Sequence, residues 1–428
     1  MREYLKKLPP EIKNLIRRAG RVANENNMRA YLVGGFVRDL ILGVKNLDVD
    51  IAVEGSGIKF AEELSAALKA KIIRHRRFGT ATISLSHNLK IDIATAREEC
   101  YPEPACLPLV KSGRLKDDLK RRDFSINAMS IGLNGDDFGR LIDFFHGLND
   151  LRSKKIRVLH DSSFIDDPTR ILRAVRFEKR YNFRIETHTL KALKKAVALK
   201  MLERVQPQRL RDELILSLKE PSGLKQIRRL NELTGFGFIN AGLSFSKKNY
   251  ALLETLEGQI NWFRKAYSRR RQLDAWLIYF FGVVDPLSSS EVQSICKRYV
   301  FSRGEEKRIL SFKKTNHSFI RRLGLKEIKP AQIFSLLEPL SYEVILALKA
   351  KYKAPLIQKR IEDFFEIYNG MRLSIRGADL HRLGVMPGPY YRKIFTRVMN
   401  AKLNGKIKTE EEEMGLMRRL TKSIRDGD

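Results

Sequence analysis

Cysteine is scarce in this chain, which has only three in 428 residues: Cys100, Cys106 and Cys296. Their spacing matches neither the paired ligands of a zinc site nor a disulfide framework, so we expect three reduced thiols without a structural role. Long apolar runs are also missing. No segment reaches the roughly 18 apolar residues that span a membrane, and the first segment, MREYLKKLPPEIKNLIRR, lacks the apolar core of a signal peptide. We therefore expect a soluble, cytoplasmic protein.

Negative charge is in short supply as well, with 50 acidic residues against 82 basic ones and a formal net charge of +32. Residues 1–150 carry only +5 of this, and residues 151–428 carry the other +27. A basic surface of that extent suits a polyanion such as RNA, because each neutralised phosphate releases counterions. A membrane surface is a weaker reading, since the cations are spread over many segments and do not form one basic amphipathic helix.

The hydrophobic pattern predicts an α+β protein with two to four packed units, because 428 residues exceed one core. Within residues 1–150, RAYLVGG, LDVDIAV, FGTATISL and LKIDIA read as strands, and FVRDLILG and GIKFAEELSAALKA read as helices. We predict a small mixed sheet with helices on one side. Residues 97–120 contain three prolines and show no clear periodicity, so we expect a long loop beside the sheet.

After residue 165 the pattern is helical almost throughout, as in PTRILRAVRFEKRY, THTLKALKKAVAL, QPQRLRDELILSL and QLDAWLIYFFGVV. PSG at 221–223 and VVDPLSSSE at 283–291 are expected helix breaks. The sequence has no repeat of fixed period. It therefore predicts an α/β head followed by a basic, all-helical body.

Carboxylates and glycines in the head form the most informative cluster. Asp48 and Asp50 alternate on one predicted strand and so project from the same face, where a divalent cation such as Mg²⁺ would relieve their repulsion. Asp92 has the alternation to add a third carboxylate from an adjacent strand. Gly34 and Gly35 end a strand and open a helix, where bare backbone N–H groups can approach phosphates. Taken singly, the glycines could be a turn and the aspartates a solvated strand face; together they indicate nucleotide and metal binding.

This order of motifs resembles the polymerase β nucleotidyltransferase superfamily. The sequence segments next to these motifs resemble one branch of that superfamily, the class II tRNA nucleotidyltransferases and bacterial poly(A) polymerases. RRDFSINAMS at 121–130 is similar to that family's ribose-recognition motif, with Ser125 for the usual threonine, and DFFHGLNDLRSKKIR is similar to the next motif, with His146 for a glycine. The resemblance implies nucleotide contacts for Arg38, Arg122, Asp123, Asn127, Arg173 and Arg176.

DDPTRILRAVRF at 166–177 resembles the family's nucleobase-selecting motif, with Asp166 for the usual glutamate. Asp167 and Arg170 are three residues apart, which would place them on one face of a helix. A carboxylate accepts from an exocyclic amine and a guanidinium donates to a ring nitrogen or carbonyl, so this pair could admit C and A and reject U and G. In isolation, the same pair would be an intrahelical ion pair.

The resemblance covers about residues 30–220, ending in ERVQPQRLRDEL with Glu203 and Arg209, and reappears in LSIRGADLHRLGVMPGPYYRKIF at 373–395. It implies a head at 1–150, a neck at 151–225, an RNA-binding body at 226–330 and a tRNA-binding tail at 331–428. It also implies Mg²⁺, CTP and ATP, and a tRNA held by its acceptor and T arms. Within the family, addition of CCA, CC or A alone stays open, and we expect the segment after residue 97 to decide it.

Three other functions compete with the tRNA nucleotidyltransferase that the motifs favour. The basic charge slightly favours a poly(A) polymerase, whereas the tail motif favours tRNA. A catalytically silent RNA-binding protein would not need Asp48, Asp50 and Arg170. A nucleotidyltransferase that modifies proteins or small molecules would leave the basic helical body unexplained. The sequence does not decide the oligomeric state.

Overall fold

The computed structural model describes residues 2–44, 48–85, 89–221, 223–267, 272–315 and 317–425. Its contacts divide the chain into two compact units, Met1–Phe238 and Ile239–Asp428. Each unit is described by itself. The first contains every residue predicted to act in catalysis or nucleotide binding. The finer division into head, neck, body and tail stays a prediction.

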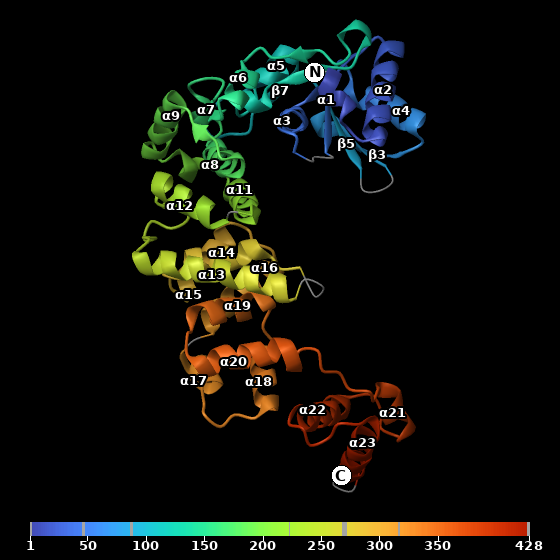
Figure 1. The fold of residues 1–428 in the computed structure, drawn as a ribbon, viewed down its shortest axis with the longest axis vertical. Coiled ribbons are helices and arrows are strands. Elements are labelled where there is room, and N and C mark those ends of the chain that lie inside the picture. Colours follow the sequence, from blue (N-terminus) through green and yellow to red (C-terminus); the bar gives the residue numbers. More distant parts are fainter. Residues whose placement is uncertain are drawn as a thin grey trace. The chain divides into compact units, whose positions relative to one another are not determined.

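The first unit is built on a mixed sheet, in which β3 and β5 are labelled in Figure 1. Its seven described strands run in the order β3-β4-β5-β2-β1-β8-β9. β2 and β5 are parallel, and the other neighbouring pairs are antiparallel. The predicted mixed sheet is thereby confirmed. The strands are β1 (Arg29–Val33), β2 (Val49–Glu54), β3 (Lys71–His75), β4 (Thr80–Ser84), β5 (Lys90–Thr95), β8 (Ser130–Gly132) and β9 (Leu141–Ile142).

Helices pack on both faces of this sheet, so the prediction that they cover one side is wrong. α2 (Pro10–Glu25) and α4 (Gly57–Leu68) pack on one face, where α4 contacts β4 and β5. On the other face α5 (Leu115–Lys120) places Leu115 and Leu119 in an apolar cluster with side chains of β1 and β2. Four consecutive residues of β1 are buried, so this strand needs apolar cover on both sides.

Residues 97–120, predicted as one long loop, largely form regular elements. β6 (Arg97–Cys100) pairs antiparallel with β7 (Leu109–Ser112), and α5 follows. The prediction failed here because neither strand alternates apolar and polar side chains, and β7 is exposed along its whole length. This hairpin has no buried apolar face. It is stabilised by the pairing of its two strands and by the ion pairs of charged side chains that are described below.

Short elements and helices complete the first unit. The predicted helices are present as α8 (Thr169–Tyr181), α9 (Thr187–Ala198) and α11 (Pro207–Lys219), and α12 (Gly223–Thr234) begins after the predicted break. The remaining elements are α1 (Arg2–Lys6), α3 (Gly35–Leu42), η1 (Arg76–Phe78), η3 (Ser125–Asn127), η4 (Gly135–Asp137), α6 (Gly147–Arg152), β10 (Lys155–Ile156), α7 (Ser163–Asp166), β11 (Arg184–Ile185) and α10 (Met201–Arg204).

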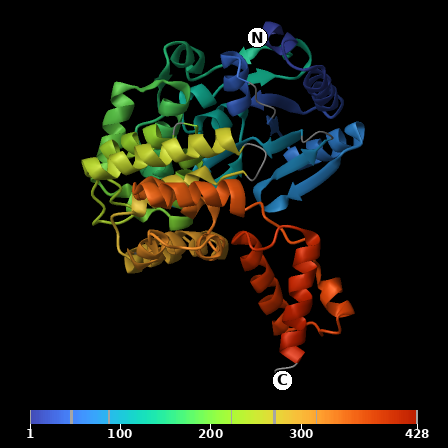
Figure 2. The same ribbon diagram turned by 60° about the horizontal axis from the view of Figure 1, so that its bottom comes forward.

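The second unit is helical throughout its described residues, which confirms the predicted class of an α+β head followed by helices. α14 is apolar on all sides and is buried from Trp276 to Val284, as expected of a core helix. The last three helices are drawn in red in Figure 2. They share a separate apolar cluster. The helices are α13 (Lys247–Ala266), α14 (Ala275–Val284), α15 (Ser289–Arg298), α16 (Arg303–Lys314), α17 (His317–Leu323), α18 (Pro330–Leu337), α19 (Tyr342–Lys351), α20 (Pro355–Asp363), η5 (Phe364–Tyr368), α21 (Gly377–Arg382), α22 (Pro389–Leu403) and α23 (Glu410–Arg425).

Within the described ranges, no single helix is both long enough and apolar enough to cross a membrane. One sharply bent pair, α18 with α19, passes that test by length and composition only.

Candidate active site

Three aspartates lie on or directly beside two neighbouring strands of the sheet. Asp48 directly precedes β2, Asp50 lies within it, and the parallel register places Asp50 beside Asp92 of β5. Burial raises the pKa of Asp50 to about 6; Arg122 opposes this rise, whereas the carboxylates of Asp92 and Asp48 add to it. A half-buried carboxylate with two further carboxylates near it is a place where a bound cation would be stabilising.

The donor set of this site fits a divalent cation held by two carboxylates. In the described part of the chain, no three His, Cys, Asp or Glu side chains are grouped closely enough to hold a metal ion. One oxygen of Asp92 accepts a 2.6 Å hydrogen bond from the hydroxyl of Thr82. The binding of a metal by Asp48 and Asp50 stays a prediction, and so does the role of Asp92 as a third ligand.

The two glycines act differently from one another. Gly34 has a φ of +70°, which favours glycine, and a side chain there would collide with the guanidinium of Arg122. Its N–H donates to the carbonyl of Met129 at 3.3 Å and is thus already bonded. Gly34 therefore allows Arg122 to approach Asp50, while Gly35, at the start of α3, lines the cavity described below.

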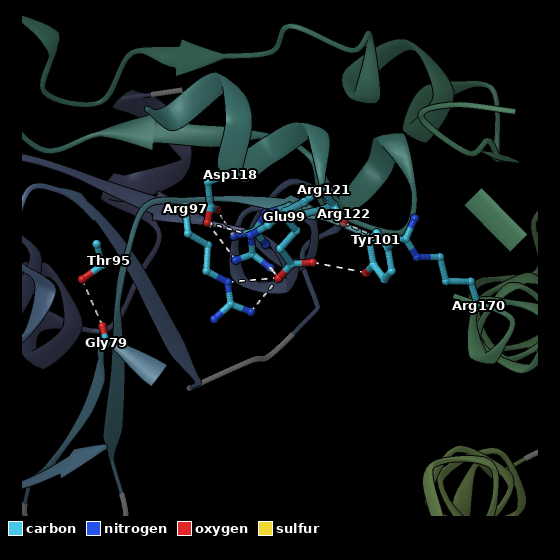
Figure 3. Close-up of polar contacts among 9 residues, drawn as sticks. All are labelled: Gly79, Thr95, Arg97, Glu99, Tyr101, Asp118, Arg121, Arg122 and Arg170. Atoms are coloured by element: carbon cyan, nitrogen blue, oxygen red, sulfur yellow. Dashed lines mark hydrogen bonds and ion pairs between the residues drawn. The ribbon is translucent and has the colours of Figure 1, made fainter. Parts of the chain in front are cut away.

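Two arginines of the RRDF motif are held by acidic side chains outside the motif (Figure 3). Asp118, only 1% exposed, accepts from Arg121 at 2.7 Å and from Arg122 at 3.0 Å. Glu99 of β6 accepts from Arg121 at 3.2 Å and from Arg97 at 2.7 Å. These contacts fix the direction of both arginines. The Nε of Arg122 is buried and has no hydrogen-bond partner within the described residues, so one donor remains for an anionic ligand.

Asp123 is the centre of a buried network that joins the head to α8 and α11. It accepts from Arg173 at 2.9 and 2.7 Å and from the side chain of Asn127 at 2.8 Å. Burial raises the pKa of Asp123, but Arg173 and the hydrogen bond from Asn127 outweigh burial and hold it at about 2. Arg173 also donates to Glu213 at 2.9 Å. Asp123 is thus firmly ionised and serves to position Arg173.

The predicted residue Arg38 lies inside the same network. Its guanidinium, on α3, donates to Asn127 and to Asp39 and stands over the rings of Phe177 and Tyr181, at 5.2 and 4.8 Å from their centroids. Cation–π contacts of this kind add to the hydrogen bonds when the cation is desolvated. Arg38 therefore ties α3 to α8 as well as lining the cavity.

The base-selecting pair differs from its prediction in one respect. Asp167 is not on the helix: with φ −133° and ψ 90° it is extended, and α8 begins at Thr169. The reason is Pro168, because the residue before a proline avoids the helical conformation. The prediction that Asp167 and Arg170 share one helical face is therefore wrong, although both side chains line the same cavity.

Each member of this pair has its own protein partners, and no ion pair joins them in the described structure. Asp167 accepts from Arg209 at 3.0 Å and from the hydroxyl of Thr169 at 2.6 Å, through the same carboxylate oxygen. Arg170, which is 4% exposed, donates to Ser163 at 2.7 Å and to the carbonyl of Arg121 at 2.8 Å. A guanidinium has five N–H donors, so these two bonds leave others for a ligand.

Sequence reasoning missed Tyr101, which lies near Arg170 (Figure 3). Burial raises the pKa of Tyr101 to about 12; the charge of Arg170 opposes the rise, and Glu99 and Asp167 add to it. Its hydroxyl donates to Glu99 at 3.3 Å. The sequence offers no local signal for this contact. The sequence does contain a signal for the contacts of Asp118. Arg121 and Arg122 follow it by three and four residues, which is the spacing of ion pairs on a helix.

Most predicted residues converge on one cavity of about 570 Å³ in the first unit, within the range of small-ligand sites. Gly34, Asp48, Asp92 and Arg176 do not line it. Arg176, 8% exposed, lies 3.2 Å from Glu213 in an ion pair. The predicted residues that line the cavity are Gly35, Arg38, Asp50, Arg122, Asp123, Asn127, Asp167, Arg170 and Arg173.

Comparison with known proteins identifies relatives along nearly the whole chain. A family model described as the poly A polymerase head domain matches residues 30–157. The A-adding tRNA nucleotidyltransferase of Geobacter sulfurreducens is 36% identical over 97% of this chain, which spans only 48% of that relative's length. The A-adding tRNA nucleotidyltransferase of Halalkalibacterium halodurans is 31% identical, over 94% of this chain and 91% of its own.

Solved structures agree with these relatives. A structure described as the apo form II of a CCA-adding enzyme is 36% identical, with a TM-score of 0.79 and coverage of 97% of both chains. The Thermotoga maritima CCA-adding enzyme complexed with tRNA_CCA is 34% identical, with a TM-score of 0.73 and coverage of 99% of this chain and 98% of its own.

Proposed function

The chain belongs to the family of A-adding and CCA-adding tRNA nucleotidyltransferases, and we propose that it transfers AMP from ATP to the 3′ hydroxyl of tRNA ending in CC. The observation that carries this proposal is the single cavity that joins Asp50 and Arg122 to Asp167 and Arg170. It combines groups suited to a triphosphate with groups suited to a base. Selection of adenosine rests on the A-adding relatives.

The binding of ATP follows from the donors and acceptors that line the cavity. Arg122, with a buried Nε that lacks a partner in the described structure, is the candidate for the phosphates. The second carboxylate oxygen of Asp167 would accept from the exocyclic amine of adenine, and a remaining N–H of Arg170 would donate to the adjacent ring nitrogen. Cytosine presents the same order of groups, whereas uracil and guanine would leave buried polar groups unpaired.

We assign Mg²⁺ to Asp48 and Asp50, whose donor chemistry fits it. When bound, Mg²⁺ would neutralise charge on the triphosphate and favour ionisation of the attacking hydroxyl. The chain's own residues position the reactants: Asp118 orients Arg122 for the phosphates, and Asp123 orients Arg173 in the wall of the same cavity. Orientation of this kind supplies a large part of the barrier lowering in a reaction between two bound substrates.

Incorporation of labelled nucleotides tests the proposal. The purified chain would be given Mg²⁺ with ATP, CTP or both, and tRNA transcripts ending at the discriminator base, at C or at CC. We expect one AMP on the CC-ended transcript and nothing on the others. Long A tails on any RNA would instead indicate a poly(A) polymerase, and no incorporation at all would leave an RNA-binding protein.

Full CCA addition is a second candidate, favoured by the 36% identity to a CCA-adding enzyme over nearly both whole chains. In that case the transcript ending at the discriminator base would gain three nucleotides and then stop. The same assay therefore separates the two activities.

A further inference from the structure

One face of α8 carries a stripe of four side chains. Their spacing of three, four and four residues places them on the same side of the helix: Arg170, Arg173, Phe177 and Tyr181. The first three line the cavity of the candidate active site. Tyr181, the last residue of α8, does not line it and contacts α3 instead.

Tyr181 contacts two neighbouring residues of α3, Arg38 and Asp39, although 142 residues separate it from Asp39. Its hydroxyl donates to Oδ1 of Asp39 at 3.0 Å. The same oxygen accepts from Nε of Arg38 at 2.8 Å, and the ring of Tyr181 lies 4.8 Å from the guanidinium of Arg38. Arg38 and Asp39 are only 5% and 1% exposed. One side chain of α8 therefore contacts both members of a buried ion pair of the head.

The ring of Tyr181 is itself held in place by aromatic neighbours. Phe177 stacks against it, with ring centroids 6.1 Å apart and 23° between the ring planes, and Phe183 lies 5.7 Å away. Burial raises the pKa of Tyr181 to about 12; the charge of Arg38 opposes the rise and that of Asp39 adds to it. The hydroxyl therefore keeps its proton at neutral pH and remains a donor to Asp39.

Arg38 presents N–H donors to the cavity that it lines with Gly35. A guanidinium has five such donors; Asp39 and Asn127 accept from two of them, so others remain for a ligand. Nη2 of Arg38 lies beside the start of α3, because a Cβ added to Gly35 would be 3.4 Å from it. A guanidinium next to the N-terminal end of a helix is suited to an anion such as a phosphate.

We propose that Tyr181 is a positioning residue for the incoming nucleotide, which it affects by holding Arg38 in the direction that binds ATP. This inference rests on the proposed function. Tyr181 acts on Arg38 in two ways, through the hydroxyl that holds Asp39 and through the ring that covers the guanidinium. A flexible arginine side chain binds its ligand best when its direction is already fixed, because less freedom is then lost on binding. Tyr181 thus links the helix of the base-selecting Arg170 to the helix of Arg38.

Two substitutions of Tyr181 separate these contributions in steady-state transfer of AMP to CC-ended tRNA. Tyr181→Phe keeps the ring and loses the hydrogen bond to Asp39, and it should raise KM for ATP by about fivefold. Tyr181→Leu also removes the cation–π contact and should raise KM by about 30-fold. In both variants kcat should stay within about twofold of the wild type, because binding of ATP is weakened equally before and during the reaction. An unchanged KM in Tyr181→Leu, or a fall in kcat alone, would overturn the proposal.

Tyr279→Phe is the matched control in the second unit. It removes a hydroxyl that donates to Glu257 at 2.9 Å, which is the same chemical change at a site distant in sequence from the cavity residues. Its KM for ATP should stay within about twofold of the wild type. A rise equal to that of Tyr181→Phe would show that loss of a tyrosine hydroxyl acts through general destabilisation.

A double-mutant cycle tests whether Tyr181 acts through Arg38. Once Arg38→Gln has removed the guanidinium, Tyr181→Phe has nothing left to position. The double variant should therefore have the same KM for ATP as Arg38→Gln alone, within about twofold. A further rise of about fivefold in the double variant would show that Tyr181 acts independently of Arg38 and would refute the positioning role.

The two levels of inference fail separately. A wild-type protein that transfers AMP, with Tyr181 variants that keep its KM for ATP, would refute the positioning role alone. A wild-type protein that transfers nothing to any tRNA would refute the proposed function. In that case the Kd for ATP without RNA still tests Tyr181, since it should rise by the same factors as KM, and an unchanged Kd would refute the positioning role as well.

Discussion

Asp123→Asn should destabilise the first unit in a pH-dependent way. The ordinary pKa of this carboxyl is 3.8, and the fold holds it at about 2. Each tenfold change in a proton dissociation constant is worth about 1.4 kcal/mol, so ionised Asp123 contributes about 2 kcal/mol. Because the folded-state pKa is the lower one, this stabilisation is fully present above about pH 4 and is lost as the pH falls toward 2. The neutral asparagine removes it.

Urea unfolding read by pulsed hydrogen–deuterium labelling and mass spectrometry measures this effect for each unit separately. Between pH 7 and pH 5, peptides from α8 should give a free energy of unfolding about 2 kcal/mol higher for the wild type than for Asp123→Asn. This difference between the two proteins should be smaller at pH 3. Asp137→Asn is the control, because Asp137 pairs with Arg140 on the surface and should change stability by less than about 1 kcal/mol. A gap that does not depend on pH would refute the electrostatic reasoning.

Three further predictions concern the backbone at His146 and Gly147, the hydrogen bond between Arg209 and Asp167, and the basic surface. His146 has a φ of +58°, so His146→Gly should raise the free energy of unfolding by about 1 kcal/mol in urea. Gly147→Ala should lower it by about 1–3 kcal/mol, because the added Cβ would meet the carbonyl of Ser125. The opposite order of stabilities would contradict this account. Arg209→Gln should remove the hydrogen bond that Arg209 donates to Asp167. Because a charge-assisted hydrogen bond is worth about 1.5–3 kcal/mol, the ratio of kcat/KM for ATP to that for UTP should fall by about tenfold. An unchanged ratio would exclude a role of Arg209 in positioning Asp167. Affinity for tRNA should fall by roughly 1,000-fold between about 50 and about 200 mM salt if about six phosphates are contacted, and a flat dependence would show that the basic surface does not bind RNA.

The sequence predicted the parts of the fold that depend on local periodicity. Strands β1, β2, β4 and β5 and helices α8, α9 and α11 lie where alternation or helical spacing predicted them. β6 and β7 were missed because their side chains are mostly polar and their partners are distant, such as Arg121 for Glu99. Long-range ion pairs of this kind leave no local pattern.

The candidate site was predicted in its composition but not in its geometry. The extended conformation of Asp167 could have been read from Pro168, which follows it, since proline restricts the preceding residue. The bond from Gly34 to Met129 could not, because it depends on the pairing of β1 with β8. The sequence also contained no sign that Asp50 lines two cavities.

The most direct test of the central claim is the mass of a CC-ended tRNA after incubation with ATP, Mg²⁺ and either the wild-type protein or Asp48→Asn. We predict the gain of one AMP with the wild type and none with Asp48→Asn, while both proteins bind the tRNA with equal affinity. An unchanged mass with the wild type, or the same gain with both proteins, would contradict the account.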